Sequence, residues 1–238
     1  MKQINHVAKI FHVTAQAVRT LGDYYSSLRL QGQLESQNHF PKPTVLPNSP
    51  LLKPLVFKRQ IELPLRHSGL RCLFVAEYGG TDVLVKFCET YSEKAHSTLA
   101  EARLAPVLHY CSMIAGDIFM VVMDLVDCLD AYREFGSKAL PSTVLDDVKL
   151  ALETLHNANL VFGDIRRPNI MVHKSQEGGE EWRGLLVDFD WAGPVGKAKY
   201  PPMLNKEIGW ADGVDSATEI KKDHDLEMLN KLNVDAEE

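Results

Sequence analysis

Three polar residues, Asp164, Asn169 and Asp188, follow one another in an order that suits metal-assisted transfer of a phosphoryl group. Asp164 and Asn169 lie in a polar turn between apolar stretches, and Asp188 follows the apolar run 185–187. Transfer of the terminal phosphate of a nucleotide needs a carboxylate for the bridging metal, a second oxygen ligand and a separate base for the attacking hydroxyl. Asp188 and Asn169 are the candidates for the metal and Asp164 is the candidate for the base, with Asn169 counted among the catalytic residues as well.

The two segments that carry these residues resemble motifs of the protein-kinase-like superfamily. In that superfamily the catalytic loop reads His-Arg-Asp with an asparagine five residues later, and the metal motif reads Asp-Phe-Gly at the end of a strand. Here residues 162–164 read Phe-Gly-Asp with Asn169 at the same spacing, and residues 188–190 read Asp-Phe-Asp. The glycine before the catalytic aspartate also resembles small-molecule kinases of the aminoglycoside and choline type.

A lysine upstream extends the resemblance. Residues 83–86 read Val-Leu-Val-Lys and are similar to the third kinase strand, so Lys86 would hold the α and β phosphates of the nucleotide. The next predicted helix, 92–105, resembles the kinase helix whose glutamate pairs with that lysine. We assign the pairing to Glu101, with Glu93 as the alternative. A neighbouring carboxylate would keep a half-buried lysine charged and in place.

Residues 118–126 resemble the fifth kinase strand, which runs into the hinge between the lobes. The resemblance implies that Met123 guards the back of the adenine pocket, and that Asp124 and Val126 offer backbone groups to the base. Arg166 takes the place two residues after the catalytic aspartate, where many kinases carry a lysine aimed at the transferred phosphate. Arginine supplies the same charge as a bidentate fork, so we place Arg166 in the catalytic group.

The first 88 residues predict a helix, a linker and three strands. Residues 5–29 carry apolar side chains at helical spacing and predict a packing helix, with a docking or regulatory role as the alternative. The proline-rich stretch 31–53 indicates a linker. Strands are predicted at 56–63, 71–78 and 82–88, the last two joined by a tight hairpin turn at 79–81.

Two helices are predicted around the catalytic loop. The first, at 142–158, is capped by Ser142 or Thr143 and would deliver the loop. A second stretch, beginning at His224 and Asp225, resembles the kinase helix whose aspartate ties down the backbone of that loop.

The predicted features occur in the order that kinases follow, over about residues 56–230. We therefore expect an α+β protein with the two-lobed protein-kinase-like fold, in which the small lobe has a mainly antiparallel sheet and the large lobe is helical and shortened. The expected divisions are an N-terminal helix and linker at 1–55, the small lobe and hinge at 56–126, and the truncated large lobe at 127–238.

Three departures from the kinase pattern bear on activity. The segment 63–69 has a single glycine where kinases have a glycine-rich loop, so fewer backbone N–H groups can approach the phosphates closely. Phe-Gly at 162–163 replaces His-Arg and removes the arginine that a phosphorylated activation loop would engage. Asp190 replaces the last glycine of the metal motif, which either restricts the backbone or adds a second carboxylate to the metal site.

The resemblance implies an ATP-dependent and Mg²⁺-dependent phosphotransferase that acts on a hydroxyl of a protein or of a small alcohol. Lys86, Asp164, Asn169 and Asp188 favour this enzyme. The alternative is a catalytically silent kinase-like binding module, which the missing glycine-rich loop and the short large lobe favour.

Composition limits the partners and the compartment. The net charge of −6 argues against general binding of nucleic acids. The longest apolar run, 118–123, is too short to cross a membrane. The four cysteines lie far apart, which is typical of free thiols in a reducing compartment. We expect an intracellular protein without nucleic-acid or membrane partners, located in the cytoplasm, with the nucleus left open.

Overall fold

The computed structural model describes residues 2–27, 41–47, 53–61, 72–115, 117–175 and 181–234 of the chain. The chain separates into two compact units, Met1–Pro41 and Lys42–Glu238. The predicted linker at 31–53 falls mostly, and the segment 63–69 entirely, outside the described residues. The division into a small and a large lobe at residue 126 stays a prediction.

The first unit contains one described helix, α1 (Lys2–Ser27), where the sequence predicts a helix at 5–29. Apolar side chains in the middle of α1 are exposed, Phe11 by 70% and Val18 by 63%. No helix in the described parts of the chain combines the length and the apolar character that a membrane span requires.

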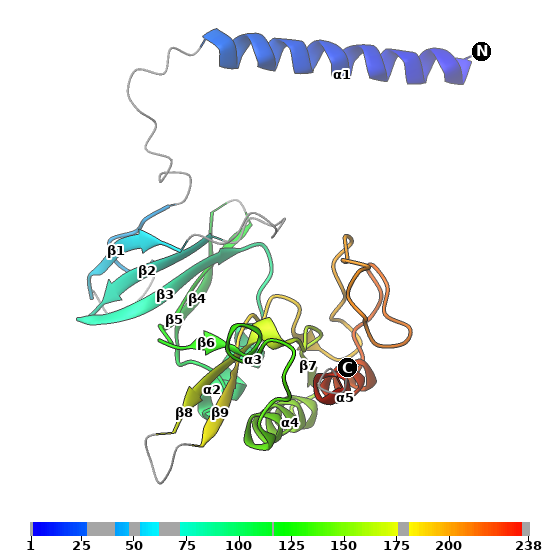
Figure 1. Ribbon diagram of the computed structural model, residues 1–238. Helices are drawn as coiled ribbons and strands as arrows, with labels where there is room; N and C mark the ends of the chain where they lie inside the picture. The colour runs from blue at the N-terminus through cyan, green and yellow to red at the C-terminus, as the bar shows by residue number, and fades with distance from the viewer. Residues whose placement is uncertain are drawn as a thin grey trace. The chain divides into compact units, whose positions relative to one another are not determined.

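The second unit opens with a five-stranded antiparallel sheet in the order β1-β2-β3-β5-β4 (Figure 1). Its strands are β1 (Leu55–Gln60), β2 (Cys72–Tyr78), β3 (Thr81–Cys88), β4 (Leu108–Ala115) and β5 (Ile118–Asp124). The strands predicted at 56–63, 71–78, 82–88 and 118–126 correspond to β1, β2, β3 and β5. The sequence does not predict β4, because this edge strand mixes polar and apolar residues without the alternation that identifies a strand.

The turn between β2 and β3 is the predicted hairpin. Gly79 and Gly80 have φ angles of +62° and +93°, a region of backbone space that glycine enters without the steric cost of a Cβ atom. The turn fixes the register of β3 against β2, and successive side chains of a strand point to opposite faces. Lys86 therefore lies on the face opposite to the buried side chains of Val85 and Phe87.

Helix α2 (Glu93–Glu101) starts where predicted but ends four residues earlier than the predicted residue 105. Its N-cap is Ser92, whose hydroxyl accepts a bond from the N–H of Ala95. At its C-terminal end Arg103 has a φ of +60°, and the N–H of Leu104 donates to the carbonyl oxygen of Leu99 at 2.8 Å. This is a Schellman ending, which closes the helix before the proline is reached.

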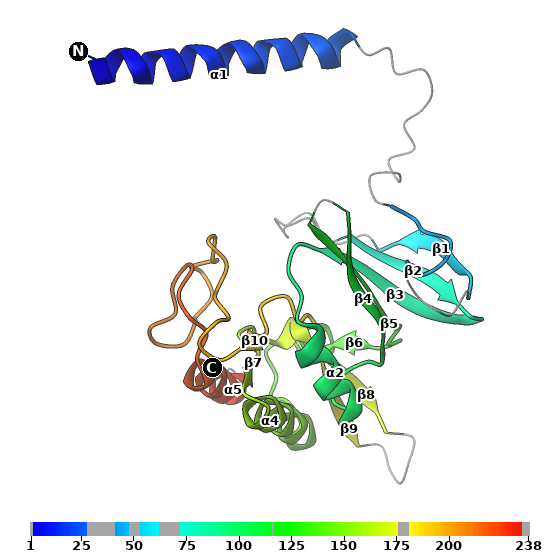
Figure 2. The same cartoon turned by 180° about the vertical axis from the view of Figure 1, so that it is seen from behind.

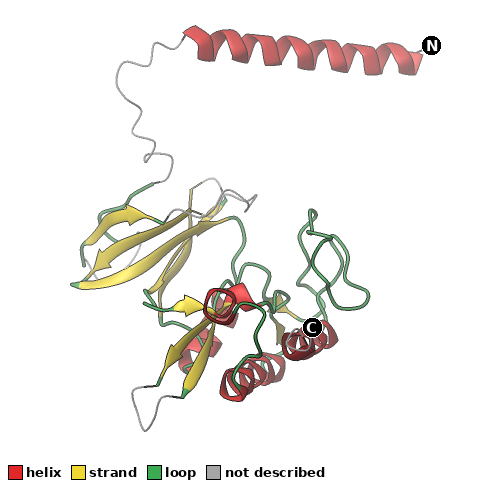
Figure 3. Cartoon of the chain, viewed as in Figure 1, coloured by secondary structure: helices red, strands yellow, loops and turns green. Residues whose placement is uncertain are grey.

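The remainder of the unit combines helices, long loops and two small sheets, β10-β7 and β6-β8-β9 (Figures 2 and 3). Its elements are β6 (Leu129–Asp130), α3 (Ala131–Phe135), α4 (Ser142–Asn157), β7 (Leu160–Val161), the 3-10 turn η1 (Arg167–Asn169), β8 (Ile170–Lys174), β9 (Trp182–Leu186), β10 (Gly193–Pro194) and α5 (Lys222–Val234). Helix α4 contacts α2, α5 and β9. Its buried residues Val148, Leu152 and Leu155 belong to the main apolar core, together with Phe162 and Leu229.

The predicted cap of α4 is wrong. Pro141 is the N-cap residue and Ser142 is the first helical residue. The hydroxyl of Thr143 donates instead to the carbonyl oxygen of Trp182 at 2.6 Å. The side chain proposed as a cap therefore fastens α4 to β9.

Candidate active site

Residues 162–169, the predicted catalytic loop, are held by one carboxylate of α5. Asp225 is 1% exposed and accepts bonds from the backbone N–H groups of Phe162, at 2.9 Å, and Gly163, at 2.7 Å. Nε2 of His156 on α4 lies 3.0 Å from the same carboxylate. The role predicted for the helix that begins near residue 224 is confirmed by these contacts.

Gly163 has two reasons to be glycine. Its φ is +84°, and a Cβ atom at this position would lie 2.7 Å from Cδ1 of Ile220. Ile220 is fully buried in a small cluster with Val161 and Tyr200. The close approach of Ile220 to the loop therefore requires a residue without a side chain immediately before Asp164.

Gly163→Ala should cost more stability than Gly196→Ala, measured by thermal unfolding. Both glycines have a similar φ, +84° and +79°, so both alanine variants lose about 1–2 kcal/mol to the left-handed backbone. Nothing lies within 4 Å of the Cβ position at Gly196, whereas Ile220 obstructs that of Gly163. Equal losses in the two variants would contradict the importance of the Ile220 contact.

Asp164 is buried and already engaged at both carboxylate oxygens. Nε of Arg166 donates to Oδ1 at 2.5 Å, and Nη2 donates to Oδ2 at 2.7 Å. Nδ2 of Asn169 donates to Oδ2 at 2.8 Å and to the Asp164 carbonyl oxygen at 2.9 Å. Burial raises the pKa of the Asp164 carboxyl above its usual value, and the Arg166 guanidinium opposes that shift. The structure thus brings the three predicted catalytic residues together.

Arg166 also stacks on the segment that follows the metal motif. Its guanidinium carbon lies 5.3 Å from the ring centroid of Trp210. The ring centroids of Trp191 and Trp210 lie 5.6 Å apart. A guanidinium is attracted to the face of an aromatic ring, so Trp210 gives Arg166 a second support besides Asp164.

Asp188 lies two residues after β9, in an uncommon backbone conformation. Its φ is +72°, in a region that residues other than glycine seldom adopt, although aspartate does so more often than most. The N–H of Val187 donates to the carbonyl oxygen of Asn169 at 3.0 Å, so the two predicted metal ligands are coupled through the backbone.

Lys86 lies between two carboxylates of this segment. Its Nζ is 2.6 Å from Oδ1 of Asp188 and 2.5 Å from Oδ1 of Asp190. The lysine is only 5% exposed. Burial acts to lower the pKa of Lys86, but the carboxylates of Asp188 and Asp190 outweigh it and hold this pKa above its ordinary value.

The sequence predicts that Glu101 pairs with Lys86, and this prediction is wrong. Glu101 is exposed at the end of α2. The buried residues of this helix are Ala95, His96 and Leu99, which share a face at helical spacing. Glu101 follows Leu99 by two residues and therefore does not belong to that face. The alternative, Glu93, is also exposed.

The inward position on α2 is taken by His96, which stacks on Phe189 with ring centroids 4.6 Å apart. Its ring nitrogens lie 2.7 Å from the hydroxyl of Tyr91 and 2.8 Å from the carbonyl oxygen of Pro106. Burial lowers the pKa of His96 to about 4, so this ring is neutral at pH 7. The helix therefore packs on the metal motif through aromatic contacts.

The predicted hinge residues follow one another at the end of β5. Met123 is 4% exposed, and Val126 is half-buried in the loop after the strand. The N–H of Asp124 donates to the carbonyl oxygen of Val107 at 2.9 Å, and its carboxylate lies 2.6 Å from Nε2 of His109. A contribution of Asp124 to a nucleotide base would therefore come from its carbonyl oxygen.

The oxygen ligands at the site suit a magnesium–nucleotide complex. Mg²⁺ is usually held by one or two carboxylates together with substrate phosphates and water. Asp188 supplies a carboxylate, and Asn169, whose amide nitrogen bonds Asp164, supplies an amide oxygen. Among the described residues no three His, Cys, Asp or Glu side chains form a metal cluster, so the phosphates would complete the coordination.

One residue of the catalytic loop that the sequence analysis missed is Arg167. It is 6% exposed and donates to the carbonyl oxygens of Gly136, at 2.8 Å, Lys138, at 2.7 Å, and Leu232, at 3.3 Å. An arginine in a polar turn normally indicates a solvated side chain, so the sequence carries no signal for this contact. Arg167 fastens the loop to the end of α5 and to the segment after α3.

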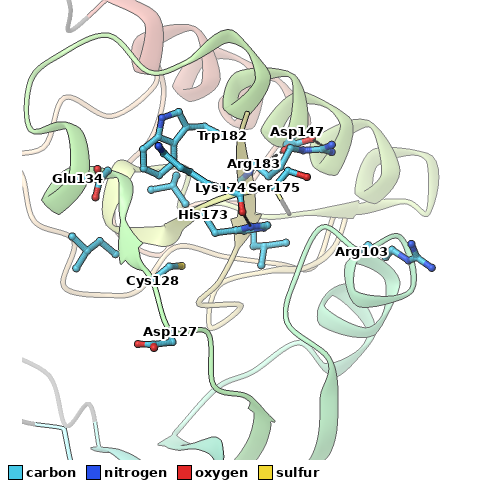
Figure 4. Close-up of a pocket in the computed structure, with 14 residues that line it drawn as sticks. Arg103, Asp127, Cys128, Glu134, Asp147, His173, Lys174, Ser175, Trp182 and Arg183 are labelled. Carbon is cyan, nitrogen blue, oxygen red and sulfur yellow. Dashed lines mark hydrogen bonds and ion pairs between the residues drawn. The ribbon is translucent and has the colours of Figure 1, made fainter. Parts of the chain in front are cut away.

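A pocket of about 890 Å³ lies apart from this group of residues (Figure 4). Its lining comes from the loop after β5 and from β8 and β9, with Asp127, His173 and Arg183 among the labelled side chains. Neither Lys86 nor Asp164 is among the residues that line it. The pocket therefore does not mark the predicted catalytic residues.

Comparisons with known proteins agree with the fold. No model of a protein family matches the sequence, and no curated protein matches it. Among solved structures, the chain is similar to the kinase PK-1 of Cydia pomonella granulovirus, with a TM-score of 0.59 and 14% identity over 76% of this chain and 67% of the viral one. A likeness at this identity concerns the fold alone. The chain thus has the α+β, two-lobed fold of the protein kinases.

Proposed function

We propose that the protein is an ATP-dependent phosphotransferase of the protein-kinase type, which transfers the γ-phosphate to a hydroxyl group with the help of Mg²⁺. The observation that carries the proposal is the meeting of three distant segments. Lys86 of β3 contacts Asp188 at 2.6 Å, and the backbone next to Asp188 bonds the carbonyl oxygen of Asn169, whose side chain contacts Asp164 at 2.8 Å. This arrangement supports the order of roles that phosphoryl transfer requires.

Each of these residues has a proposed role. Bound Mg²⁺ would neutralise negative charge on the phosphates, and Asp188 and Asn169 would hold it. Lys86 would bind the α and β phosphates. Asp164 would take the proton of the attacking hydroxyl. The oxygen of that hydroxyl would bond to the γ-phosphorus, while the bond between the γ-phosphorus and the leaving oxygen of ADP breaks. Burial raises the pKa of Asp164, which makes its carboxylate a stronger proton acceptor than an exposed aspartate.

Arg166 would exchange partners during the reaction. It occupies both oxygens of Asp164, and a base in that state has poor access to a substrate proton. A γ-phosphate offers the guanidinium a more highly charged bidentate partner. We therefore propose that nucleotide binding draws Arg166 to the phosphate and releases Asp164 for the acceptor, which is a protein or a small alcohol.

The same contact favours a second candidate, a catalytically silent module that binds nucleotide without transfer. If Arg166 stays on Asp164 after nucleotide binds, the carboxylate cannot serve as a base. The two candidates share the nucleotide site and differ only at Asp164. Nucleotide binding therefore tests both, and transfer separates them.

ATP with Mg²⁺ should raise the unfolding temperature of the protein, and ATP in EDTA should raise it less. A ligand at 100 times its Kd stabilises the folded state by about 2.7 kcal/mol, which shifts the midpoint by roughly 5–10 °C for a domain of this size. Lys86→Met should reduce both shifts, because the lysine would bind the phosphates. Asp188→Asn should reduce mainly the part that depends on metal.

Glu101→Gln is the matched control, since Glu101 is exposed and does not reach Lys86. Its nucleotide shifts should equal those of the wild type. An unchanged midpoint for the wild type at millimolar Mg²⁺-ATP, together with a flat calorimetric titration, would remove the nucleotide site from the proposal.

A further inference from the structure

The ammonium group of Lys86 has two carboxylate partners from one turn of the chain, Asp188 and Asp190. The side chain of Lys86 is 6% exposed, and those of Asp188 and Asp190 are 12% and 21% exposed. A buried ammonium requires a counter-charge, because leaving it unpaired in the interior is strongly unfavourable. The question is which of the two carboxylates supplies that charge when the site is occupied.

Helix α2 does not supply it. The carboxylates of Glu93 and Glu101 on this helix are exposed. The buried titratable side chain of α2 is the neutral imidazole of His96. The group just before the helix that faces Lys86 is the ring of Tyr91, with its centroid 5.5 Å from Nζ. An aromatic ring attracts the ammonium but carries no compensating charge.

In the proposed enzyme Asp188 would serve the metal as well as Lys86. A divalent metal on the carboxylate of Asp188 would neutralise part of the negative charge that otherwise stabilises the Lys86 ammonium group. Asp190 lies two residues further along, already in contact with Nζ at 2.5 Å. The turn that carries it is fixed by the φ of +72° at Asp188 and by a 3.1 Å bond from the N–H of Ser92 to the carbonyl oxygen of Phe189.

We propose that Asp190 is the positioning residue for Lys86. It takes the part that a helix glutamate plays in the kinases that the sequence resembles, and it leaves Asp188 to the metal. This inference rests on the proposed function. It means that one three-residue turn, 188–190, positions both the metal ligand and the phosphate-binding lysine, and that α2 acts on the lysine through its contacts with Phe189.

The catalytic test is Asp190→Asn assayed over a range of Mg²⁺ concentrations. A misplaced lysine should lower the transfer rate by about 10²-fold, and extra Mg²⁺ should not restore it. Asp188→Asn serves as the comparison, since loss of a metal ligand should raise the Mg²⁺ concentration needed for half-maximal rate. A loss in Asp190→Asn that high Mg²⁺ reverses would make Asp190 a metal ligand and overturn the inference, as would an unchanged rate.

A second test needs no nucleotide. The variants Lys86→Met, Asp190→Asn and the double variant form a cycle in thermal unfolding, and the midpoint of the double variant should lie roughly 2–6 °C above the value that the two single shifts add up to. The same cycle with Glu101→Gln in place of Asp190→Asn should be additive. Additive shifts for Asp190 would overturn the pairing.

The two tests separate failure of the inference from failure of the proposed function. If the wild type binds no nucleotide, the proposed function fails, while the unfolding cycle still decides whether Asp190 holds Lys86. If the wild type binds Mg²⁺-ATP and transfers phosphate but Asp190→Asn does so equally well, the function stands and the inference alone is refuted.

Discussion

Asp164→Asn is expected to cut phosphate transfer by about 10²–10⁴-fold while ATP binding stays nearly unchanged. Asparagine keeps the size and polarity of aspartate but cannot take a proton from the attacking hydroxyl. Asp164 contacts Arg166 and Asn169 rather than Lys86, so its loss should leave the phosphate-binding lysine in place. Transfer of labelled phosphate from ATP to panels of proteins and small alcohols measures the rate, and calorimetry measures binding.

The control for this variant is Asp146→Asn, which changes an exposed aspartate on α4. Its rate and its affinity for ATP should match those of the wild type. If the wild type binds ATP, transfers phosphate to no acceptor and does not differ from Asp164→Asn, the silent binding module replaces the enzyme as the proposed function.

Asp225→Ala is expected to destabilise the protein by about 2–6 kcal/mol and to abolish transfer. The substitution leaves the buried N–H groups of Phe162 and Gly163 without their acceptor, and each unsatisfied group costs about 1–3 kcal/mol. For a domain of this size the midpoint of thermal unfolding should fall by roughly 5–20 °C. Transfer should be lost even below the new midpoint, because the loop that carries Asp164 loses its anchor.

Asp223→Ala is the matched control, because Asp223 lies in the first turn of the same helix and is exposed. Such a surface change should alter stability by no more than about 0.5 kcal/mol. Asp225→Asn, which retains one acceptor oxygen, should fall between the two. If the melting temperature of Asp225→Ala equals that of the wild type, the loop keeps its conformation without the bonds to Asp225, and the prediction is wrong.

The spacing within the predicted catalytic loop could be read from the sequence because its information is local. Asp164 and Asn169 lie five residues apart, and Nδ2 of Asn169 indeed contacts the Asp164 carboxylate at 2.8 Å. The alternation around Lys86 and the glycine pair at 79–80 predict β3 and its turn for the same reason. Patterns of this kind need only the preferences of neighbouring residues.

Features that depend on distant partners are the ones that the sequence misses. The pairing of Lys86 with Asp190 joins residues 104 positions apart, and sequence spacing carries no signal for it. The assignment of Glu101 rests on resemblance to the kinase helix, whereas the face of α2 that is buried carries His96 and leaves Glu101 exposed. Arg167 shows the same limit, since its acceptors belong to the segment after α3 and to α5.

The anchoring of the catalytic loop by Asp225 links the loop to local unfolding of the last helix. The bonds to Phe162 and Gly163 span 63 and 62 residues, so they persist only while α5 (Lys222–Val234) stays docked against α4. Any opening that detaches α5 exposes the two amide protons to exchange with solvent and frees the loop at the same moment. Hydrogen exchange at the amides of Phe162 and Gly163 therefore measures the free energy needed to detach α5. The order of the predicted catalytic loop depends on that helix as much as on the loop itself.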